Sequence, residues 1–565
     1  MKFSQLADYF ERLERITSRI ELSEVLAEVL KNCLPEEVDK VIYLLMGEIA
    51  PPYRGLEFGL SEKLTAEATS KAYGVKISQV NDLYKKLGDL GEVALHLNQR
   101  EGKGLDVVQV YQELYQVASA KGTWEKVMRL VNLLRGLSGK ESKYVVRIVI
   151  GRLRLGIGEA TLIEALALAF GRRSLKELIE RAYNLCSDLG LVASTLFKEG
   201  VQSLESFKIQ VGYPIRPALA ERVSSPSEII SRLGRCALEV KYDGFRLQIH
   251  KKGKEVEIYS RNLERMTQMF PDVVSAVLEL PFEELIFEGE AIAYNESTGE
   301  FYPFQITIQR KRKYDVHKYS EEYPLKLFAF DLLYLEGEDY TVKPFVERRK
   351  RLEGVVIGNS LIEPSEMIIA EEVKQVEEFF EKAIERGLEG IMAKRLDAPY
   401  TAGSRNFNWI KLKRSYKGQL SDSLDLVIVG YFYGRGNRAK LGIGAVLAAV
   451  YDRDSDTFKT VAKVGSGFTE EEWIKLKHML DEIKLERKHP RVESTIEPDV
   501  WTEPRYVITV LADEITISPI HTAGYALRFP RAVGFIRADK NPEDATDLSE
   551  ILRLYEIQRK VTVGE

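Results

Sequence analysis

The chain has 565 residues, of which 45% are hydrophobic and 30% are charged, and its formal net charge is −5. This composition is typical of a globular protein with several domains, and the charge balance alone gives no reason to expect nucleic acid. The three cysteines, Cys33, Cys186 and Cys236, lie far apart, which excludes a disulfide framework and a Cys-x-x-Cys zinc site.

Residues 1–16 have the pattern of an amphipathic helix and lack the apolar segment of a signal peptide. No run of about 18 apolar residues occurs, so we expect no membrane span. We therefore expect a cytoplasmic protein, and we expect it to be a monomer.

Residues 1–215 carry apolar residues at steps of three and four almost throughout, as in 123–137 and 160–170. This pattern predicts an all-α domain. Residues 211–228 contain three prolines and several serines, a composition that is typical of a domain boundary.

Residues 216–417 mix short strands with helices and predict an α+β domain. Residues 418–565 carry short strands, a hairpin with its turn at 452–456, and a helix with a capping box at Thr469 and Glu472. This arrangement predicts a small β-barrel of the OB type. The chain ends in a helix that we expect to dock through Leu548, Ile551, Leu552 and Tyr555.

One lysine stands between two acids in the strand-like stretch ALEVKYDGFRLQIH, residues 237–250. Alternate side chains of a strand share a face, so Glu239, Lys241 and Asp243 lie together, opposite the apolar residues. One interpretation is a solvated strand face that ends in an Asp-Gly turn. The other is a reactive amine, and the rest of the chain decides between them.

Six further segments follow in a fixed order. The series is KYDGFR (241–246), SRN (260–262), FEGEAIAY (287–294), LFAFDLLY (327–334), EGIMAKR (389–395), WIKLK (409–413) and RFPRAVGFIRADK (528–540). It resembles the motif series of the covalent nucleotidyltransferases. With the helical first region and the Arg-Phe-Pro-Arg segment, essentially the whole chain resembles an ATP-dependent DNA ligase of archaeal type.

The resemblance implies a helical DNA-binding domain at 1–215, an adenylation domain at 216–417, and an OB-fold domain with a C-terminal helix at 418–565. It implies nick sealing in duplex DNA during replication, repair and recombination. Lys241 would take AMP from ATP, AMP would pass to a 5′-phosphate, and a 3′-OH would attack. An attacking lysine must be neutral, and nearby carboxylates oppose this. Glu239 and Asp243 therefore predict that Lys241 needs a metal or other partners for activation.

The resemblance also assigns the nucleotide pocket. Glu290 and Glu389 offer the hard oxygen ligands that Mg²⁺ prefers, with Mn²⁺ an alternative. Lys411 and Lys413 share one strand face, which suits a phosphate clamp. The segment around Arg405 departs somewhat from the family motif. The residues expected to contact ATP are Glu239 near the adenosine, Arg246 and Arg261 at ribose and phosphates, Phe330 on the adenine, and Glu290, Arg405 and Lys411.

Two basic groups lie outside this pocket. Arg147, Arg152 and Arg154 stand near glycines that would let backbone N–H groups approach a DNA phosphate; the alternative is a basic helix face with a glycine cap. In the last motif, Arg531 and Lys540 are expected to orient the pyrophosphate that leaves during self-adenylation.

Several alternatives share parts of this pattern. RNA ligases and mRNA capping guanylyltransferases also use Lys-x-Asp-Gly, but the helical region and Arg-Phe-Pro-Arg favour a DNA ligase. A NAD-dependent ligase would need zinc cysteines that the chain lacks. A non-catalytic nick-binding protein would have lost the motif residues. The partner expected is nicked double-stranded DNA, and the family also leads us to expect a sliding clamp, although no clamp-binding peptide pattern occurs.

Overall fold

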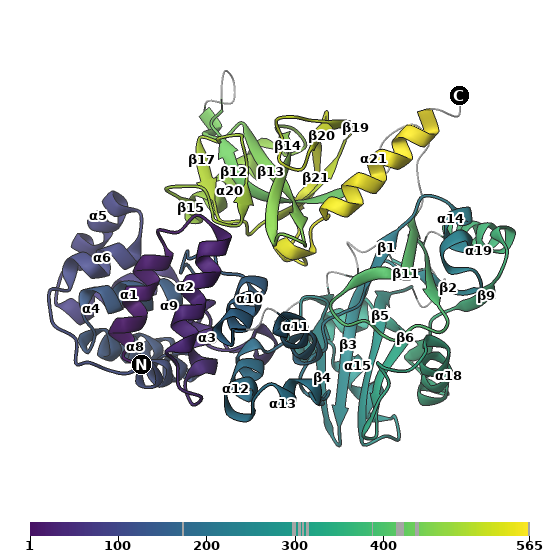
Figure 1. Cartoon of the computed structure of the whole chain (residues 1–565), viewed down its shortest axis with the longest axis horizontal. Coiled ribbons are helices and arrows are strands. Elements are labelled where there is room, and N and C mark those ends of the chain that lie inside the picture. The colour runs from purple at the N-terminus through teal and green to yellow at the C-terminus, as the bar shows by residue number, and fades with distance from the viewer. Residues whose placement is uncertain are drawn as a thin grey trace.

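Three bodies follow one another along the chain in the computed structural model (Figure 1): purple helices, a teal-to-green region with two sheets, and a yellow-green sheet that lies across the other two. The structure describes all residues except 172–173, 296–300, 303–306, 308–309, 312–315, 387, 414–422, 435–439, 513 and 563–565. Within the described residues, no helix is long and apolar enough to cross a membrane.

The first body consists of helices around one hydrophobic core, which includes residues from Phe3 to Leu204. Helix α1 illustrates the pattern, because its buried residues Phe3, Leu6 and Phe10 follow steps of three and four. The helices are α1 Phe3–Leu13, α2 Arg19–Lys31, α3 Val38–Leu45, α4 Glu62–Tyr73, α5 Ile77–Leu87, α6 Leu90–Leu97, α7 Val107–Ser119, α8 Thr123–Arg135, α9 Gly139–Val149, α10 Glu159–Ala169, α11 Leu175–Cys186, α12 Leu189–Glu199 and α13 Gln202–Glu205.

A half-buried acid in this body gives a pH-dependent prediction. Burial, with the negative charges of Glu159 and Asp188, raises the pKa of Glu48 from 4.5 to about 8. Because the folded state binds this proton more tightly than the unfolded state, its stabilising effect is full below pH 4.5 and is lost as the pH rises to about 8. We expect Glu48→Gln to raise the melting temperature by about 2–4 °C at pH 8, the scale of roughly 1 kcal/mol.

Thermal unfolding at pH 5 and pH 8 measures this effect. At pH 5 the Glu48→Gln variant should have the same melting temperature as the parent protein. The control Glu36→Gln, at an exposed position, should leave the melting temperature unchanged at both pH values. A gain of equal size at both pH values would mean that the glutamate does not titrate in this range.

The second body contains two sheets, and the chain passes between them at residues 241–245. The five-stranded sheet has the order β1-β11-β10-β2-β9, and the six-stranded sheet has the order β4-β3-β5-β6-β7 with β8 beside β6. Its strands are β1 Leu219–Arg222, β2 Cys236–Lys241, β3 Phe245–Lys252, β4 Glu255–Ser260, β5 Glu284–Ala293, β6 Leu325–Leu335, β7 Glu338–Asp339, β8 Ile362–Pro364, β9 Met367–Ala370, β10 Gly390–Arg395 and β11 Arg405–Lys413. Its helices are α14 Pro226–Leu233, α15 Pro271–Leu278, α17 Val316–Glu322, α18 Phe345–Val356 and α19 Val373–Glu385.

The crossing between the sheets depends on a glycine. A Cβ atom at Gly244 would lie only 2.2 Å from the carbonyl oxygen of Ala291 on β5. Any other residue would force the two strands apart, so the Asp-Gly pair is required by close backbone approach.

The third body is a curled, largely antiparallel sheet in which β12 pairs with β13, β17 and β18. The predicted hairpin is confirmed, because β13 ends at Asp452 and β14 begins at Thr457. The capping box of Thr469 and Glu472 is confirmed as well. The elements are β12 Leu424–Phe432, β13 Ala445–Asp452, β14 Thr457–Val464, α20 Glu470–Glu482, β15 Lys484–Leu485, β16 Val492–Glu493, β17 Val500–Thr502, β18 Val507–Leu511, β19 Glu514–Ile517, β20 Tyr525–Arg528, β21 Arg531–Ile536 and α21 Leu548–Thr562.

Helix α21 docks on this sheet, but one predicted contact is wrong. Ile551 and Leu554 are buried, and Leu548 and Tyr555 pack against the same core, whereas Leu552 is 39% exposed. The buried positions follow one helical stripe that Leu552 leaves. The all-α, α+β and OB-like sequence of bodies is confirmed; the boundaries at 215/216 and 417/418 stay predictions.

Candidate active site

Lys241 lies at the end of β2, where the chain leaves the five-stranded sheet. Antiparallel pairing with β10 sets Lys241 opposite Gly390. Leu238 and Val240 pack into a hydrophobic cluster that also contains Ile391, and alternation along the strand leaves Glu239 and Lys241 on the other face. The predicted division of this strand into a polar and an apolar face is therefore confirmed.

The carboxylate of Glu389 bridges two lysines. Its Oε2 atom accepts a hydrogen bond from Lys241 Nζ, and its Oε1 atom pairs with Lys413 Nζ. Burial would raise the pKa of Glu389, but the two ammonium groups hold this pKa well below its usual range. Burial would lower the pKa of Lys241, yet Glu389, Glu290 and Asp243 hold it above its usual value. These acids favour the ammonium form of Lys241, and an amine must lose its proton before it can act as a nucleophile.

Glu290 is the second carboxylate beside Lys241. It lies on β5 opposite Arg246 of β3, and its Oε1 atom accepts a hydrogen bond of 3.1 Å from the Gly244 amide. Burial raises the pKa of Glu290 to about 7, although Lys241, Arg246 and this amide act in the opposite direction. The positive charges near Glu290 do not fully offset the effect of burial, so its carboxyl group is only partly ionised at neutral pH.

The two carboxylates beside Lys241 are oxygen donors of the kind that Mg²⁺ binds, and Mg²⁺ binding here stays a prediction. The charge of Glu389 contributes to the raised pKa of Glu290, so the two carboxylates interact. In the part of the chain that the structure describes, no three His, Cys, Asp or Glu side chains form a complete metal site. Mg²⁺ does not need one, because it commonly binds one or two carboxylates and completes its shell with water and substrate phosphates.

Glu239 is held by three residues that the sequence did not single out. Its Oε1 atom accepts hydrogen bonds from Arg349 Nη1 at 2.7 Å and from Ser365 Oγ at 2.9 Å. Its Oε2 atom lies 2.5 Å from Lys394 Nζ. All four side chains are buried, so Glu239 belongs to a fixed wall between the strands and α18.

Phe330 lies on the same wall. The guanidinium group of Arg246 lies 5.4 Å from the ring centroid of Phe330 and 5.5 Å from that of Trp409. Its Nη2 atom donates to Glu288 Oε2, and its Nη1 atom to the carbonyl oxygen of Ala218, each at 2.8 Å. Arg246 is therefore a buried brace of the aromatic wall, and its contact with ribose or phosphate stays a prediction.

The start of α21 lies against Arg405 and Lys411 of β11. Glu550 Oε1 lies 2.8 Å from Arg405 Nη1 and 3.1 Å from Lys411 Nζ, while Asp547 Oδ2 lies 3.1 Å from Arg405 Nε. Burial lowers the pKa of Lys411 to about 7, with Glu550 opposing this and Arg405 adding to it. The structure thus brings Arg405 and Lys411 together, but around an acid of the same chain.

The segment after β21 also faces the second body. Asn262 Nδ2 donates a hydrogen bond of 2.6 Å to the carbonyl oxygen of Asp539. Lys540 pairs with Asp425, and the charge of Arg261 adds to the effect of burial in lowering the pKa of Lys540. The Nε atom of Arg261 is buried and makes no hydrogen bond to any described residue. Arg261 and Lys540 therefore lie close together at the edge of the pocket.

Arg531 does not join this group. It opens β21, whereas Lys540 follows the end of that strand. Five steps of about 3.3 Å separate the two ends of β21 by about 16 Å. Arg537 lies nearer the pocket: its hydrogen bond to Asp539, together with the charges of Asp425 and Asp243, raises its pKa. Lys540 and Arg537 share Asp425 in this structure, and the role of Arg531 at the pyrophosphate stays a prediction.

Family models match most of the chain. Residues 217–413 match the ATP dependent DNA ligase domain, residues 2–167 the DNA ligase N terminus, and residues 439–540 the ATP dependent DNA ligase C terminal region. The chain belongs to the ATP-dependent DNA ligases. It is therefore an enzyme that forms phosphodiester bonds and seals nicks in duplex DNA, through the lysyl-AMP intermediate that is general to this family.

Relatives of this ligase agree over their full length. A probable DNA ligase of Dictyoglomus thermophilum is 54% identical over 577 residues, covering 100% of this chain and 99% of that protein. DNA ligase 2 of Thermofilum pendens is 44% identical, with coverage of 100% and 99%. A DNA ligase of Sulfurisphaera tokodaii is 45% identical, with coverage of 99% and 98%. The archaeal relatives confirm the predicted archaeal type, and the family match excludes the RNA ligase, guanylyltransferase and non-catalytic alternatives.

The three arginines assigned to the DNA backbone are engaged by acids within the ligase. Arg147 lies 2.6 Å from Glu14 and 2.8 Å from Asp89. Arg152 pairs with Glu62, and Arg154 lies 3.4 Å from Asp89. Their side chains are at most 16% exposed. This arrangement favours the alternative of a structural basic group, and DNA contact through these arginines stays a prediction.

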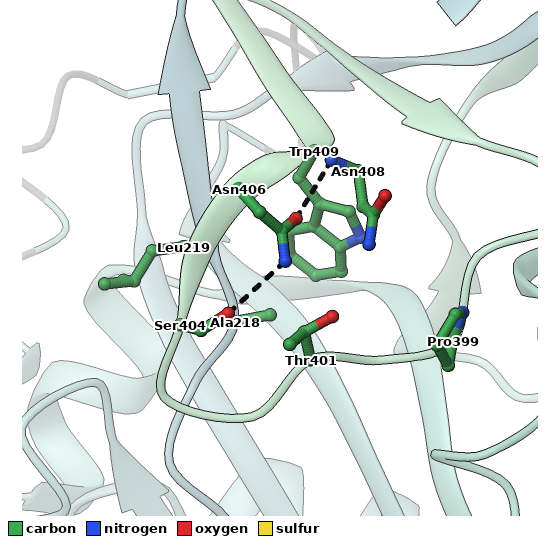
Figure 2. Close-up of a pocket in the computed structure, with 8 residues that line it drawn as sticks. All are labelled: Ala218, Leu219, Pro399, Thr401, Ser404, Asn406, Asn408 and Trp409. Atoms are coloured by element: carbon green, nitrogen blue, oxygen red, sulfur yellow. Dashed lines mark hydrogen bonds between the residues drawn. The ribbon is translucent and has the colours of Figure 1, made fainter. Parts of the chain in front are cut away.

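A small cavity lies between β1 and β11 of the ligase. Figure 2 shows Asn406 hydrogen-bonded to Ser404 and to the backbone of Asn408, with Trp409 beside them. The volume open to a water molecule is about 0 Å³, and none of the eight residues that line the space is charged. Small-molecule sites usually occupy roughly 300–1,000 Å³, so this space is not a site for ATP.

Proposed function

We propose that Lys241 is the residue that carries AMP in this ligase. The observation behind this proposal is the position of its ammonium group at the end of β2, against Glu389 and within the electrostatic reach of Glu290. The amine can act only after it loses a proton, which Glu389 holds in a hydrogen bond at rest. Its nitrogen lone pair then attacks the α-phosphorus of ATP, a P–N bond forms, and the P–O bond to pyrophosphate breaks.

In this proposal, different neighbouring residues contact different parts of the nucleotide. Glu239 and Phe330 receive the base, with Arg246 behind them. Arg261, Arg405, Lys411 and Lys413 receive ribose and phosphates, for which the fork-shaped guanidinium groups and the paired ammonium groups are suited. The support for this division is that Lys413 shares Glu389 with Lys241, that Arg405 and Lys411 share Glu550, and that Arg246 lies 5.4 Å from the ring centroid of Phe330.

We further propose that Glu290 and Glu389 hold Mg²⁺. When bound, the ion supplies positive charge that offsets the triphosphate and the two carboxylates. The chain itself places Lys241 between these two acids. A cation bound to the acids weakens the attraction of both carboxylates for the ammonium proton of Lys241.

Incubation with α-labelled ATP, and separately with α-labelled GTP, tests the proposal. We expect acid-labile, alkali-stable loading of label from ATP alone, with pyrophosphate released, and passage of that label to nicked duplex DNA. Label on a peptide without Lys241 would overturn the assignment.

Three further statements about the ligase are proposals from its family and composition. It acts on nicked double-stranded DNA as a monomer, it works in the cytoplasm, and it associates with a sliding clamp. Sedimentation with and without a clamp protein tests the first and the last together.

A prediction concerns the cations after β21. We expect Lys540→Gln to slow self-adenylation by about 10², the usual scale for one lost electrostatic stabiliser. Departing pyrophosphate needs compensating charge, whereas sealing of a nick that already carries 5′-AMP releases none, so that rate should fall less than about threefold. Single-turnover rates on ATP and on the pre-adenylated nick measure the difference.

Lys477→Gln provides a matched control, because this lysine of α20 is also paired with an acid, Asp481 at 2.5 Å, within the same body. It should change neither rate. Equal losses in both reactions of the Lys540 variant would assign this lysine to folding or to the grip on DNA.

A further inference from the structure

Residues 151–158 join α9 to α10, and their backbone is held in a strained shape. Arg154 has a φ of 60°, in the left-handed region that residues other than glycine seldom adopt. Such conformations persist where the surrounding structure enforces them, and they gather at sites that bind ligands. The sequence predicts DNA backbone contact in this segment, and the strained arginine supports a functional role for it.

The third body lies directly on the glycines of this segment. A Cβ atom at Gly156 would lie 2.8 Å from the Cδ atom of Pro490, and a Cβ atom at Gly158 would lie 2.8 Å from the guanidinium carbon of Arg491. Glycine permits a ligand to approach the backbone closely. Here residues of the third body occupy the room that the two glycines leave.

A hydrogen bond and an ion pair extend this contact to the start of the segment. Arg505, between β17 and β18, donates a hydrogen bond of 2.9 Å from Nη2 to the carbonyl oxygen of Gly151. Glu482, at the end of α20, places its Oε2 atom 3.6 Å from Arg152 Nη2. Burial raises the pKa of Glu503, and the charges of nearby arginines, Arg152 among them, oppose this. The third body thus sets two acids near an arginine that is expected to meet DNA phosphates.

Asp456 occupies the other end of the segment. It stands in the turn between β13 and β14, and its Oδ2 atom accepts a hydrogen bond of 3.2 Å from Thr161 Oγ1 in the first turn of α10. The same atom lies 3.7 Å from Arg19 Nε on α2. The N-terminal turn of a helix attracts anions, phosphates included. A carboxylate of the third body therefore lies where a DNA phosphate would be favoured.

We propose that the third body is an autoinhibitory cover that competes with nicked DNA for residues 151–161. This inference rests on the proposed action on nicked DNA and on the predicted contact of this segment with the DNA backbone. Only molecules in which the cover has lifted bind DNA through the segment, so the apparent affinity falls as the fraction of covered molecules rises. A substitution that loosens the cover therefore tightens DNA binding.

Arg505→Gln tests the cover, because a lost DNA contact and a lost cover have opposite effects. Removal of a cation that contacts DNA weakens binding. Removal of the hydrogen bond to Gly151 loosens the cover instead, and the Kd for a nicked duplex should fall about threefold, the scale of one modest hydrogen bond. Fluorescence anisotropy of a labelled nick, without ATP or metal, measures the Kd. The melting temperature should stay unchanged, since Arg505 is exposed.

Glu482→Gln tests the cover through Arg152. It should also lower the Kd about threefold, within the range of an exposed ion pair, but only while Arg152 is present. Loss of any acid favours DNA slightly, so Glu471→Gln measures that general effect, because Glu471 is exposed in the first turn of the same helix. In an Arg152→Gln background, Glu482→Gln should do no more than Glu471→Gln does, because its partner is gone.

The outcomes separate this inference from the predictions on which it rests. If Arg505→Gln weakens DNA binding or leaves it unchanged, the third body does not compete with DNA and the inference is wrong. Equal gains from Glu482→Gln with and without Arg152 would contradict it as well. If Arg152→Gln changes DNA affinity in neither the parent nor the Arg505→Gln protein, the predicted DNA contact fails and the inference fails with it. Loading of label from ATP, measured in Arg505→Gln and Glu482→Gln, tests Lys241 separately and should be normal in both.

Discussion

Lys241→Arg is expected to abolish transfer of label from α-labelled ATP to the ligase. Arginine stays protonated at any pH at which the protein is folded, so it offers no lone pair to the α-phosphorus. It keeps the positive charge between Glu389 and Glu290, and the pocket should therefore retain its electrostatic balance. ATP-dependent sealing should fall by at least about 10³, within the range lost when a nucleophile is removed.

Two measurements make this test specific. Lys252→Arg carries the same substitution at an exposed position of β3, and it should label normally. A nick that already carries 5′-AMP bypasses the lysine, so the Lys241→Arg protein should lose much less activity on it. Normal labelling of Lys241→Arg would remove this lysine from the mechanism.

Glu290→Gln should slow self-adenylation and AMP transfer by about 10² or more. The amide oxygen of glutamine can still accept the hydrogen bond from Gly244, so the substitution removes charge and keeps local geometry. Mg²⁺ would lose one of its two proposed ligands, and the requirement for Mg²⁺ should rise in parallel. Binding of nicked DNA without metal should hardly change. Quench-flow rates and fluorescence anisotropy measure the two effects.

The control for this variant lies on the same strand. Glu284 is on β5 as well, where it accepts a hydrogen bond of 3.0 Å from the hydroxyl group of Tyr334, and Glu284→Gln should leave the chemical steps unchanged. If Glu290→Gln weakened DNA binding and chemistry by the same factor, Glu290 would support the fold and would not be a metal ligand.

Strand pairing explains why the centre of the site could be predicted from sequence. Lys241, Glu290 and Glu389 each stand at a fixed place on or beside a strand, and hydrogen-bonded registers carry such places into space with little freedom. The same holds for the two faces of β2. The order of short motifs and the periodicity inside each element are the features from which structure can be predicted well.

Long-range ion pairs explain most of what could not be predicted from the sequence. Arg349 lies in the charged run 347–351, which has the pattern of a solvated helix face, but its partners Glu239 and Ser365 come from other elements. The sequence does not show that Arg147 is paired with acids, because Asp89 and Glu14 are far away in the chain. Arg531 and Lys540 are neighbours in one motif, yet an extended strand separates them. No periodicity contains this information, because it depends on how distant elements of one body pack against one another.

The acid at the start of α21 acts as an internal counter-ion. Without Glu550, Lys411 would lose the acid it is paired with and Arg405 would keep only Asp547, a costly state for cations in a dry site. A triphosphate that takes hold of these cations must therefore displace the carboxylate, and the reaction is an exchange of one anion for another. Glu550 belongs to α21, the helix that docks on the third body. We expect this exchange to remove the ion pairs that connect α21 with Arg405 and Lys411. We therefore expect nucleotide binding at Arg405 and Lys411 to release the start of α21 from β11, because both events compete for the same cations.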